Sequence, residues 1–298
     1  MSNIVIPAHN EAGVIDRCMR TLAAAASPGS IVVACNGCTD DTAARARAAG
    51  GDRVTVIETE VASKSHALNL GDAAASGFPR FYVDADVILT GEAVAEVAAA
   101  MAREPGVLAA APLIEFDLSD RPWAVRAFYE VWSALPYCRN GMIGSGVYAL
   151  SEAGRARFGK FPDITADDAY VRLQFQPHER MTVQTCRFTV TPPKTLGGVV
   201  KIKTRAYFGD YELRARFPEL FANKQDGHGR ALVGLLKKPG WWARVAVYLY
   251  VRMLSRALGY RRFYFGDHRK WERDDSSRQR VAAAQRTGNQ QLTTNNLL

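Results

Sequence analysis

Short apolar runs alternate with alanine-rich stretches through the first third of the chain. Four runs, at 4–6, 31–33, 54–57 and 81–83, have the length and the side chains of buried β-strands. The stretches between and after them, at about 11–26, 39–49, 64–76 and 91–103, have helical character. Alternating strands and helices predict an α/β fold in which helices flank a mixed, mostly parallel sheet.

The rest of the chain is less regular. Residues 169–173 predict a helix, and residues 241–260 predict an amphipathic helix. A chain of 298 residues that is 48% apolar can bury a large core. We expect an α/β domain over 1–198, a basic and mostly helical region over 199–280, and a polar, disordered tail over 281–298.

Two carboxylates stand where the fourth strand ends. Asp84 and Asp86 flank Ala85, between the apolar runs 81–83 and 87–89. On a strand, both acids would face one side of the sheet and Ala85 the other. Two such charges are costly to bury without a partner, and a divalent cation held by carboxylate and phosphate oxygens is one candidate. A solvated strand end or turn is the alternative.

Polar residues also follow the first two strands. Pro7 ends the first strand, Asn10 is expected to cap the next helix, and Glu11 would lie in its first turn. Asn36 ends the second strand, in a position to hydrogen-bond a base edge, and Lys64 opens a helix within reach of a phosphate. Ligands of α/β sheets bind beyond the carboxyl ends of the strands, so these positions predict a binding site. Helix capping and solvation are the alternatives for each residue alone.

The five cysteines are Cys18, Cys35, Cys38, Cys138 and Cys186. Cys35 and Cys38 have C-x-x-C spacing, but a zinc site would need a second ligand pair, which the sequence lacks. A thioredoxin-like redox pair is the alternative for these two. The odd count and the lack of a signal peptide predict reduced thiols in a cytoplasmic protein.

The net charge of +8 is unevenly spread: residues 1–198 carry −4 and residues 199–298 carry +12. This asymmetry predicts an anionic partner for the last third of the chain, with a solubilising surface as the alternative.

The chain contains no run of 18 apolar residues, so no membrane span is predicted. The last third of the chain also lacks a recognised nucleic-acid module, so nucleic acid is not expected as a partner.

The segment 241–260 carries Arg244, Arg252 and Arg256, which fall within about 120° on a helical wheel. It resembles a helix that lies in the plane of an anionic membrane surface, on the inner face of the membrane. Packing of the same helix on the domain is the alternative.

Four motifs in this order resemble glycosyltransferase family 2, the inverting nucleotide-sugar transferases with a GT-A fold. The family's P-x-x-N-E loop is similar to Pro7-Ala8-His9-Asn10-Glu11, and its D-D-G-S-T-D-G-T turn is similar to residues 35–42. Its K-x-x-A-x-N-x-G helix is similar to residues 64–71, and its D-x-D to Asp84-Ala85-Asp86. The resemblance covers about residues 1–175.

The resemblance implies a role for each matching residue. Asp86 would bind the metal on the diphosphate, and Asp84 would contact the ribose or the metal through water. Asp168 would be the general base, oriented by Asp167. The nucleotide pocket would be formed by Pro7, Ala8, Asn10, Glu11, Asn36, Lys64, Asp84 and Ala85.

Two further groups are expected at the sugar. Gly144, Ser145 and Gly146 would let the backbone approach the donor sugar closely. Lys201, Lys203 and Arg205 follow Gly197-Gly198 and are expected on a loop that closes over the donor and meets the diphosphate, with a basic surface as the alternative.

The implied activity is inverting transfer of a sugar from a nucleotide-diphosphate donor to an acceptor hydroxyl, with Mg²⁺ or Mn²⁺ as cofactor. The usual aspartates of the second turn are Cys35 and Asn36 here, so uridine, guanosine and thymidine carriers stay open, with a UDP-sugar favoured. The acceptor would be a saccharide or a lipid-linked polysaccharide precursor. A metal-dependent nucleotidyltransferase and a non-catalytic nucleotide-sugar-binding protein are the alternatives.

Overall fold

The structure is a computed structural model that describes residues 3–23, 29–141, 145–224 and 228–266 of the chain. The predicted tail over 281–298 lies outside these residues. The strands are β1 Asn3–Ala8, β2 Ile31–Asn36, β3 Val54–Thr59, β4 Arg80–Val83, β5 Ala109–Phe116, β6 Val147–Leu150 and β7 Arg180–Val190. The α-helices are α1 Ile15–Ala23, α2 Thr42–Gly50, α3 Lys64–Ala74, α4 Gly91–Arg103, α5 Trp123–Ser133, α6 Pro136–Arg139, α7 Glu152–Arg155, α8 Asp167–Leu173, α9 Leu196–Arg216, α10 His228–Leu236 and α11 Trp242–Phe265.

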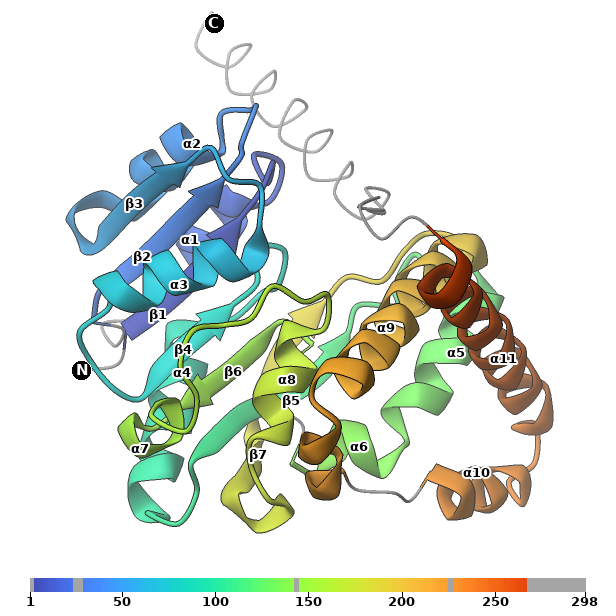
Figure 1. The fold of residues 1–298 in the computed structure, drawn as a ribbon. Coiled ribbons are helices and arrows are strands. Elements are labelled where there is room, and N and C mark those ends of the chain that lie inside the picture. Colours follow the sequence, from blue (N-terminus) through green and yellow to red (C-terminus); the bar gives the residue numbers. More distant parts are fainter. Residues whose placement is uncertain (1–2, 24–28, 142–144, 225–227, 267–298) are drawn as a thin grey trace, which may run out of the picture.

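The strands form one sheet in the order β3-β2-β1-β4-β6-β5-β7 (Figure 1). Neighbours pair in parallel except at β6, which runs antiparallel to both β4 and β5. The mixed, mostly parallel sheet predicted from the sequence is therefore confirmed.

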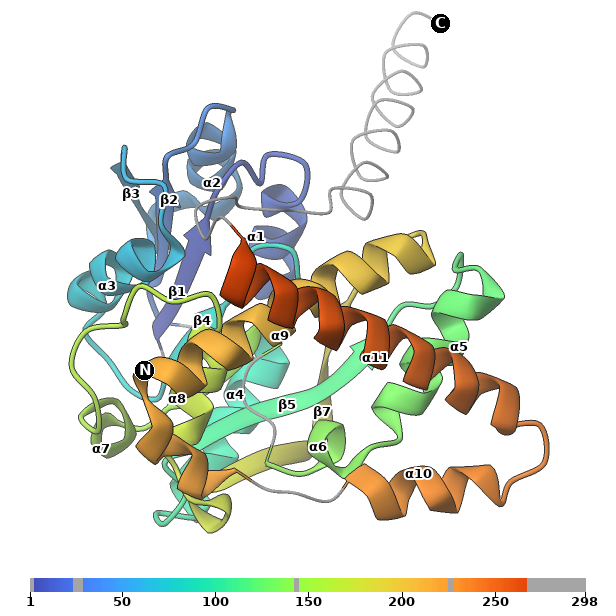
Figure 2. The same ribbon diagram turned by 45° about the vertical axis from the view of Figure 1, so that its right-hand side comes forward.

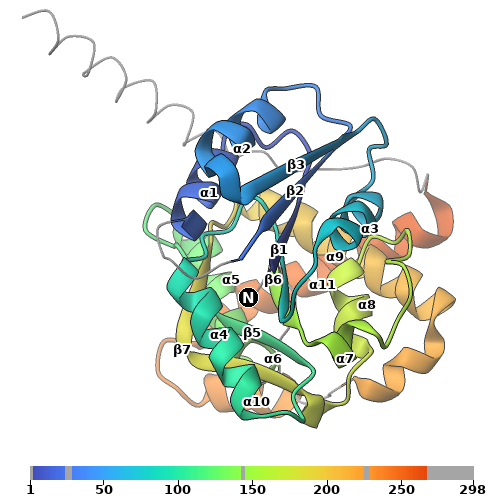
Figure 3. The ribbon, with the colours of Figure 1, turned by 90° about the vertical axis from the view of Figure 1, so that its left-hand side faces the viewer.

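The central strands are apolar on both faces because helices cover both faces. Along β1, Ile4 and Ile6 belong to one buried cluster and Val5, between them, to the other. Helices α1, α2 and α4 lie on one side of the sheet, and α3 and α8 on the other (Figure 3). This arrangement leaves the carboxyl ends of β1, β2 and β4 as an open edge where polar residues gather.

The four helices predicted in the first third of the chain are present as α1 to α4, but two details of this half differ from the prediction. Asp84 to Asp86 form a turn after β4 rather than part of a strand, and Ile88 makes only an isolated bridge to Thr189. Asn10 does not cap α1, which begins at Ile15. The chain instead turns at Asn10, where φ is 52°, before the helix can start.

The largest correction concerns Lys201, Lys203 and Arg205, which the sequence analysis expects in a loop. They lie in α9, a helix of 21 residues. Gly197 and Gly198 suggested flexibility, yet the Thr195 side chain caps the helix by accepting the Gly198 N–H at 3.1 Å. Lys201, Lys203 and Arg205 are therefore held on a regular helix.

Helices α5, α9 and α11 pack together beside the sheet, and α11 lies across the other two (Figure 2). Their shared core includes Phe128, Val199, Val245, Tyr248 and Val251. One face of α11 thus packs on the domain, as the alternative reading of this helix predicted. Among the described residues, no helix has both the length and the apolar character needed to cross a membrane.

A buried cluster around Asp72 fixes the far end of α3. Arg80 of β4 and Arg155 of α7 donate to its two carboxylate oxygens at 2.6 and 2.8 Å, and the Tyr82 hydroxyl also donates to it. Burial opposes the charge, but the bonds from Arg155, Tyr82 and Arg80 hold the pKa of Asp72 below its usual value. The cluster ties α3 to its neighbours, and Lys64 stands at the other end of this helix.

Candidate active site

A cavity of about 880 Å³ opens at the carboxyl ends of β1, β2 and β4. One wall consists of strand ends and turns, and the opposite wall of α5, α8, α9 and α11. Glu11, Asp84 and Asp86 lie on the first wall, and aromatic and basic side chains line the second together with Asp167, Asp168 and Asp210. The predicted site residues on its surface are Pro7, Glu11, Asn36, Lys64, Asp84, Ala85, Asp86, Ser145, Gly146, Asp167, Asp168, Lys201, Lys203 and Arg205.

The turn from Asp84 to Asp86 is clamped by the start of β6. The Asp84 N–H donates to the Gly146 carbonyl at 2.8 Å, and the Val87 N–H closes the turn on the Asp84 carbonyl at 3.3 Å. Gly146 has φ +106°, and a Cβ there would lie 2.7 Å from Val87. Only glycine fits this close approach. Both acids line the cavity, while Ala85 is 3% exposed and packs in the core.

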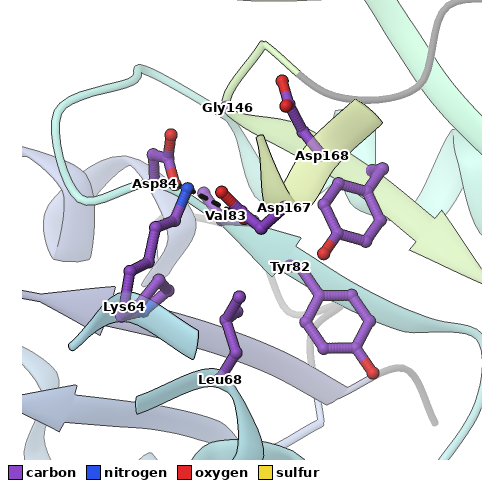
Figure 4. A pocket seen from close by; sticks show the side chains of 10 residues that line it. Lys64, Leu68, Tyr82, Val83, Asp84, Gly146, Asp167 and Asp168 are labelled. Carbon is purple, nitrogen blue, oxygen red and sulfur yellow. Dashed lines mark ion pairs between the residues drawn. The ribbon is translucent and has the colours of Figure 1, made fainter. Parts of the chain in front are cut away.

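Lys64 joins the two acid pairs of the sequence. Its Nζ lies 2.9 Å from Asp84 Oδ1 and 3.1 Å from Asp167 Oδ2 (Figure 4). Burial works against the charge of Lys64, yet Asp167, Asp84 and Asp168 raise the pKa of its ammonium above the usual value. Burial also raises the pKa of the Asp167 carboxyl, and Lys64 offsets part of that rise. Lys64 is thus a fixed cation between two carboxylates that would otherwise repel each other.

Asp168 stands apart from this pair (Figure 4). Its Oδ2 accepts the Ser145 N–H at 3.0 Å, and its Oδ1 accepts the Ala169 N–H at 2.7 Å. Ser145 has φ 55°, an uncommon conformation for a residue other than glycine, and this conformation aims its N–H at the carboxylate. Both acids line the cavity, but Asp167 is 5% exposed and paired with Lys64, whereas Asp168 is only half-buried, so Asp168 is the more accessible of the two.

Asn36 and its neighbours close the other end of the cavity. Asn36 is 3% exposed, and its side-chain amide donates to the Ala8 carbonyl at 2.9 Å. The backbone carbonyl of Asn36 lies 2.5 Å from His9 Nδ1. Asn10 accepts the Thr39 N–H at 2.8 Å, which joins the loops after β1 and β2.

Three predicted positions are not part of the described lining. Ala8 and Asn10 support the loops behind the cavity and do not line it. Gly144 lies outside the described residues.

The aromatic and basic wall was largely missed by sequence reasoning. Phe128 and Trp132 come from α5, Tyr137 from α6, Arg172 from α8, and Tyr248 from α11. Only Arg172 could have been predicted from the sequence to lie near Asp168, because it follows Asp168 by four residues and therefore lies on the same face of a helix.

The cysteines take no part in this cavity. All five are free thiols, and Cys35 is buried at the end of β2. Burial, with a smaller contribution from Cys38, raises the pKa of the Cys35 thiol to about 12. A thiol held so far from ionisation is a poor nucleophile, which argues against the redox reading of the C-x-x-C spacing.

A model of the family described as "Glycosyl transferase family 2" matches residues 3–157. The chain belongs to this family. The match spans β1 to α7 and so covers the Asp84–Asp86 turn, whereas Asp167 and Asp168 lie beyond its end. The protein is therefore a glycosyltransferase, as the four motifs predicted.

Solved structures similar to this glycosyltransferase confirm the GT-A fold. A mannosyltransferase from Pyrobaculum calidifontis, in complex with GDP-mannose and Mn²⁺, has a TM-score of 0.58 at 20% identity, with 97% of this chain and 79% of that chain covered. The glucosyl-3-phosphoglycerate synthase of Mycobacterium tuberculosis, with Mn²⁺, UDP and glucosyl-3-phosphoglycerate, has a TM-score of 0.51 at 17% identity, with 72% and 79% covered. None of the curated proteins compared with the glycosyltransferase matches it.

Proposed function

We propose that the protein is an inverting glycosyltransferase that moves a sugar from a nucleotide-diphosphate donor to an acceptor hydroxyl. The observation that carries this proposal is the convergence of Asp84 and Asp86 with Asp168 in one cavity, although the two segments are far apart in sequence. One acid pair suits a metal-bound diphosphate, and Asp168 suits a proton acceptor. Inverting transfer needs both functions on opposite sides of one sugar carbon.

The donor would occupy the wall formed by the strand ends. Pro7, Glu11 and Asn36 would line the nucleoside, and a UDP-sugar is the favoured donor. The amide of Asn36 is already oriented by its bond to Ala8, so its remaining acceptor oxygen would be the atom available to a base.

Mg²⁺ or Mn²⁺ is the proposed cofactor, and the donor set fits it. Such hard cations take one or two carboxylates together with substrate phosphates, and Asp84 and Asp86 provide carboxylate oxygens at the cavity surface. The family resemblance gives Asp86 as the main protein ligand, with Asp84, which also contacts Lys64, beside it. When bound, the metal would stabilise the charge on the departing diphosphate. The similar mannosyltransferase and glucosyl-3-phosphoglycerate synthase were both solved with Mn²⁺.

Asp168 would act as the general base. The acceptor oxygen forms a bond to the anomeric carbon as the bond from that carbon to the diphosphate breaks, and the hydroxyl proton passes to the Asp168 carboxylate. The N–H groups of Ser145 and Ala169 hold this carboxylate in place. Asp167, paired with Lys64, would position it by fixing the start of α8.

Thermal denaturation with UDP, GDP, TDP, CDP and ADP, each with and without Mn²⁺, tests the donor assignment. We expect a metal-dependent rise in melting temperature with UDP, of roughly 5 °C or more when the ligand is at about 100 times its Kd. A rise with another diphosphate alone would correct the carrier. The absence of any nucleotide shift would contradict the proposed function.

We further propose that the acceptor is a lipid-linked or polysaccharide precursor and that the outer face of α11 touches an anionic membrane surface. Trp242, Met253 and Tyr264 on this face are 70%, 71% and 57% exposed. They follow one another at helical spacing, opposite the buried Val251 and Ser255. Residues 228–265 contain eight Lys or Arg and no Asp or Glu. Arg244 pairs with Glu130 of α5, but the segment as a whole has an excess of cations. Exposed aromatic side chains in such a segment suit an anionic lipid surface.

Sedimentation with phosphatidylglycerol vesicles checks this surface. The wild type should bind these vesicles, and more weakly at high salt. The triple variant Trp242→Ser, Met253→Ser, Tyr264→Ser should bind at least about tenfold more weakly than the wild type. Each of the three side chains contributes on the order of 1.5 kcal/mol or more when it is buried in the membrane surface. Trp123→Ser, which removes a 52% exposed tryptophan from α5, should bind like the wild type. Equal binding by the triple variant, or no binding by the wild type, would contradict the membrane proposal.

A further inference from the structure

Two cations lie in the cavity on the α8 and α9 side of Asp168. Arg172 is four residues after Asp168 in α8 and is only 8% exposed. Its guanidinium carbon lies 4.6 Å from the ring centre of Tyr137. Lys203 reaches the same cavity from α9, with its Nζ 3.5 Å from the ring centre of Trp132.

Neither cation has an acidic partner. Across the part of the chain that the structure describes, Arg172 and Lys203 form no ion pair, and the Arg172 Nε is buried without a hydrogen bond. Burial lowers the pKa of the Lys203 ammonium to about 8, and the nearby Cys138 and Asp168 offset only part of this fall. Stacking on aromatic rings offsets only part of the desolvation of such charges.

A third buried cation lies beside Arg172, although the acids Asp168 and Asp210 line the same cavity without forming an ion pair with Arg172 or Lys203 in the described structure. Arg180 of β7 is 5% exposed and donates to the Arg172 carbonyl at 3.5 Å. Burial, and then the charge of Arg172, lower the pKa of Arg180 to about 10. An unpaired cluster of this kind is retained where a ligand supplies the missing negative charge.

We propose that Arg172 and Lys203 form a subsite that binds an oxyanion of the acceptor, a phosphate or a carboxylate group, and so places the acceptor hydroxyl next to Asp168. The inference rests on the proposed function, because it takes Asp168 as the base. A guanidinium matches both kinds of oxyanion with two parallel N–H bonds, and a lysine adds a point charge. The rings of Tyr137 and Trp132 would exclude water from the ion pairs.

The location of the two cations favours the acceptor over the donor diphosphate. The diphosphate belongs with the metal at Asp84 and Asp86, and in an in-line displacement the attacking hydroxyl approaches from the side opposite the leaving group. Asp168, as the proposed base, lies on the side from which the acceptor hydroxyl attacks. Arg172 shares a helix face with Asp168, whereas the cation that contacts Asp84 is Lys64. This reassigns Lys203, which the sequence analysis expects on the diphosphate.

The test uses inorganic phosphate and acetate as probes of the full chain, with saturating UDP and Mn²⁺ present and potassium chloride at matched ionic strength as the salt control. Phosphate or acetate should raise the melting temperature of the wild type beyond the chloride control. In Arg172→Gln and in Lys203→Met, the Kd for that oxyanion should rise at least tenfold while the UDP shift stays unchanged. A stronger response to phosphate would indicate a phosphorylated acceptor, and a stronger response to acetate a carboxylated one.

Two further variants separate binding from folding and from bulk charge. Arg172→Lys keeps one charge without the two parallel bonds and should bind more weakly than the wild type but more tightly than Arg172→Gln. Arg126→Gln removes an exposed cation of α5, 53% accessible at its side chain, and should bind like the wild type. In addition, oxyanion affinity of the wild type should fall between pH 7.5 and 9.5 as Lys203 loses its proton, and this fall should be absent in Lys203→Met.

Three results would overturn the subsite. They are no oxyanion effect in the wild type, an equal effect in Arg172→Gln, and a loss of UDP affinity in the two variants with oxyanion binding retained. The last result would indicate that Arg172 and Lys203 bind the diphosphate of the donor. If the wild type shows an oxyanion shift but no nucleotide shift, the proposed transferase activity fails while the subsite stands.

Discussion

Replacing Asp168 with asparagine is expected to lower kcat by a factor on the order of 10²–10⁴. Asparagine has nearly the same shape, and its side-chain oxygen can still accept one of the two N–H groups, from Ser145 or Ala169, that hold Asp168. It cannot take a proton from the acceptor hydroxyl at neutral pH. The rate of nucleoside diphosphate release from the donor, with acceptor present, measures the loss.

Nucleotide binding separates this effect from misfolding. The metal-dependent thermal shift with the nucleoside diphosphate should be the same in Asp168→Asn and the wild type, because Asp168 lies away from the Asp84–Asp86 turn. Asp163→Asn is the matched control. Asp163 precedes α8 and accepts the Ser65 hydroxyl at 3.1 Å, but it does not line the cavity, so this variant should keep most of the rate. Equal losses in the two variants, or full activity in Asp168→Asn, would count against the base assignment.

Replacing Asp86 with alanine is expected to remove the Mn²⁺-dependent part of the nucleotide shift and to lower kcat at least about 100-fold. Asp86 is the proposed metal ligand because it lines the cavity and matches the second acid of the family's D-x-D motif. A bound divalent cation supplies several kcal/mol of stabilisation to the departing charge, and each 1.36 kcal/mol corresponds to a factor of ten in rate.

The residual nucleotide shift distinguishes a metal effect from a collapsed pocket. In Asp86→Ala, any shift measured without Mn²⁺ should equal that of the wild type, because Pro7, Glu11 and Asn36 are unchanged. Asp52→Ala removes an exposed acid from the turn before β3 and should behave as the wild type with and without metal. A full Mn²⁺-dependent shift in Asp86→Ala would move the metal to other ligands.

The elements that sequence reasoning predicted well are those whose local pattern agrees with their final surroundings. The strands of the first third read as continuous apolar runs because helices cover both faces of the sheet, and their ends carry polar residues because the cavity opens there. The stretch with Lys201, Lys203 and Arg205 was wrongly predicted to be a loop, because Gly197 and Gly198 were taken as a sign of flexibility. Thr195 and the packing of α9 on α11 overcome the low helix propensity of glycine.

Asp84 and Asp86 line the same cavity, as the sequence predicted, but they do so in a turn and not in a strand. Alternation along a strand predicted that both acids share one side, with Ala85 on the other. They do line one cavity, but in a turn that the neighbouring Val87 closes and that Gly146, from a distant segment, holds in place. The partner of Asp84 in the described structure, Lys64, was placed correctly at the start of a helix, yet its contact with Asp167 depends on two segments about a hundred residues apart.

By itself, the sequence determined the fold class, the family and the acid pairs, because these depend on local patterns of apolar, turn-forming and charged residues. Only the tertiary structure decided which side chains face one another. Arg172 and Lys203 come from different helices, and their aromatic partners Tyr137 and Trp132 from two others. Burial and pairing of a charge depend on neighbours that are brought together by packing between distant segments, so local sequence patterns do not contain that information.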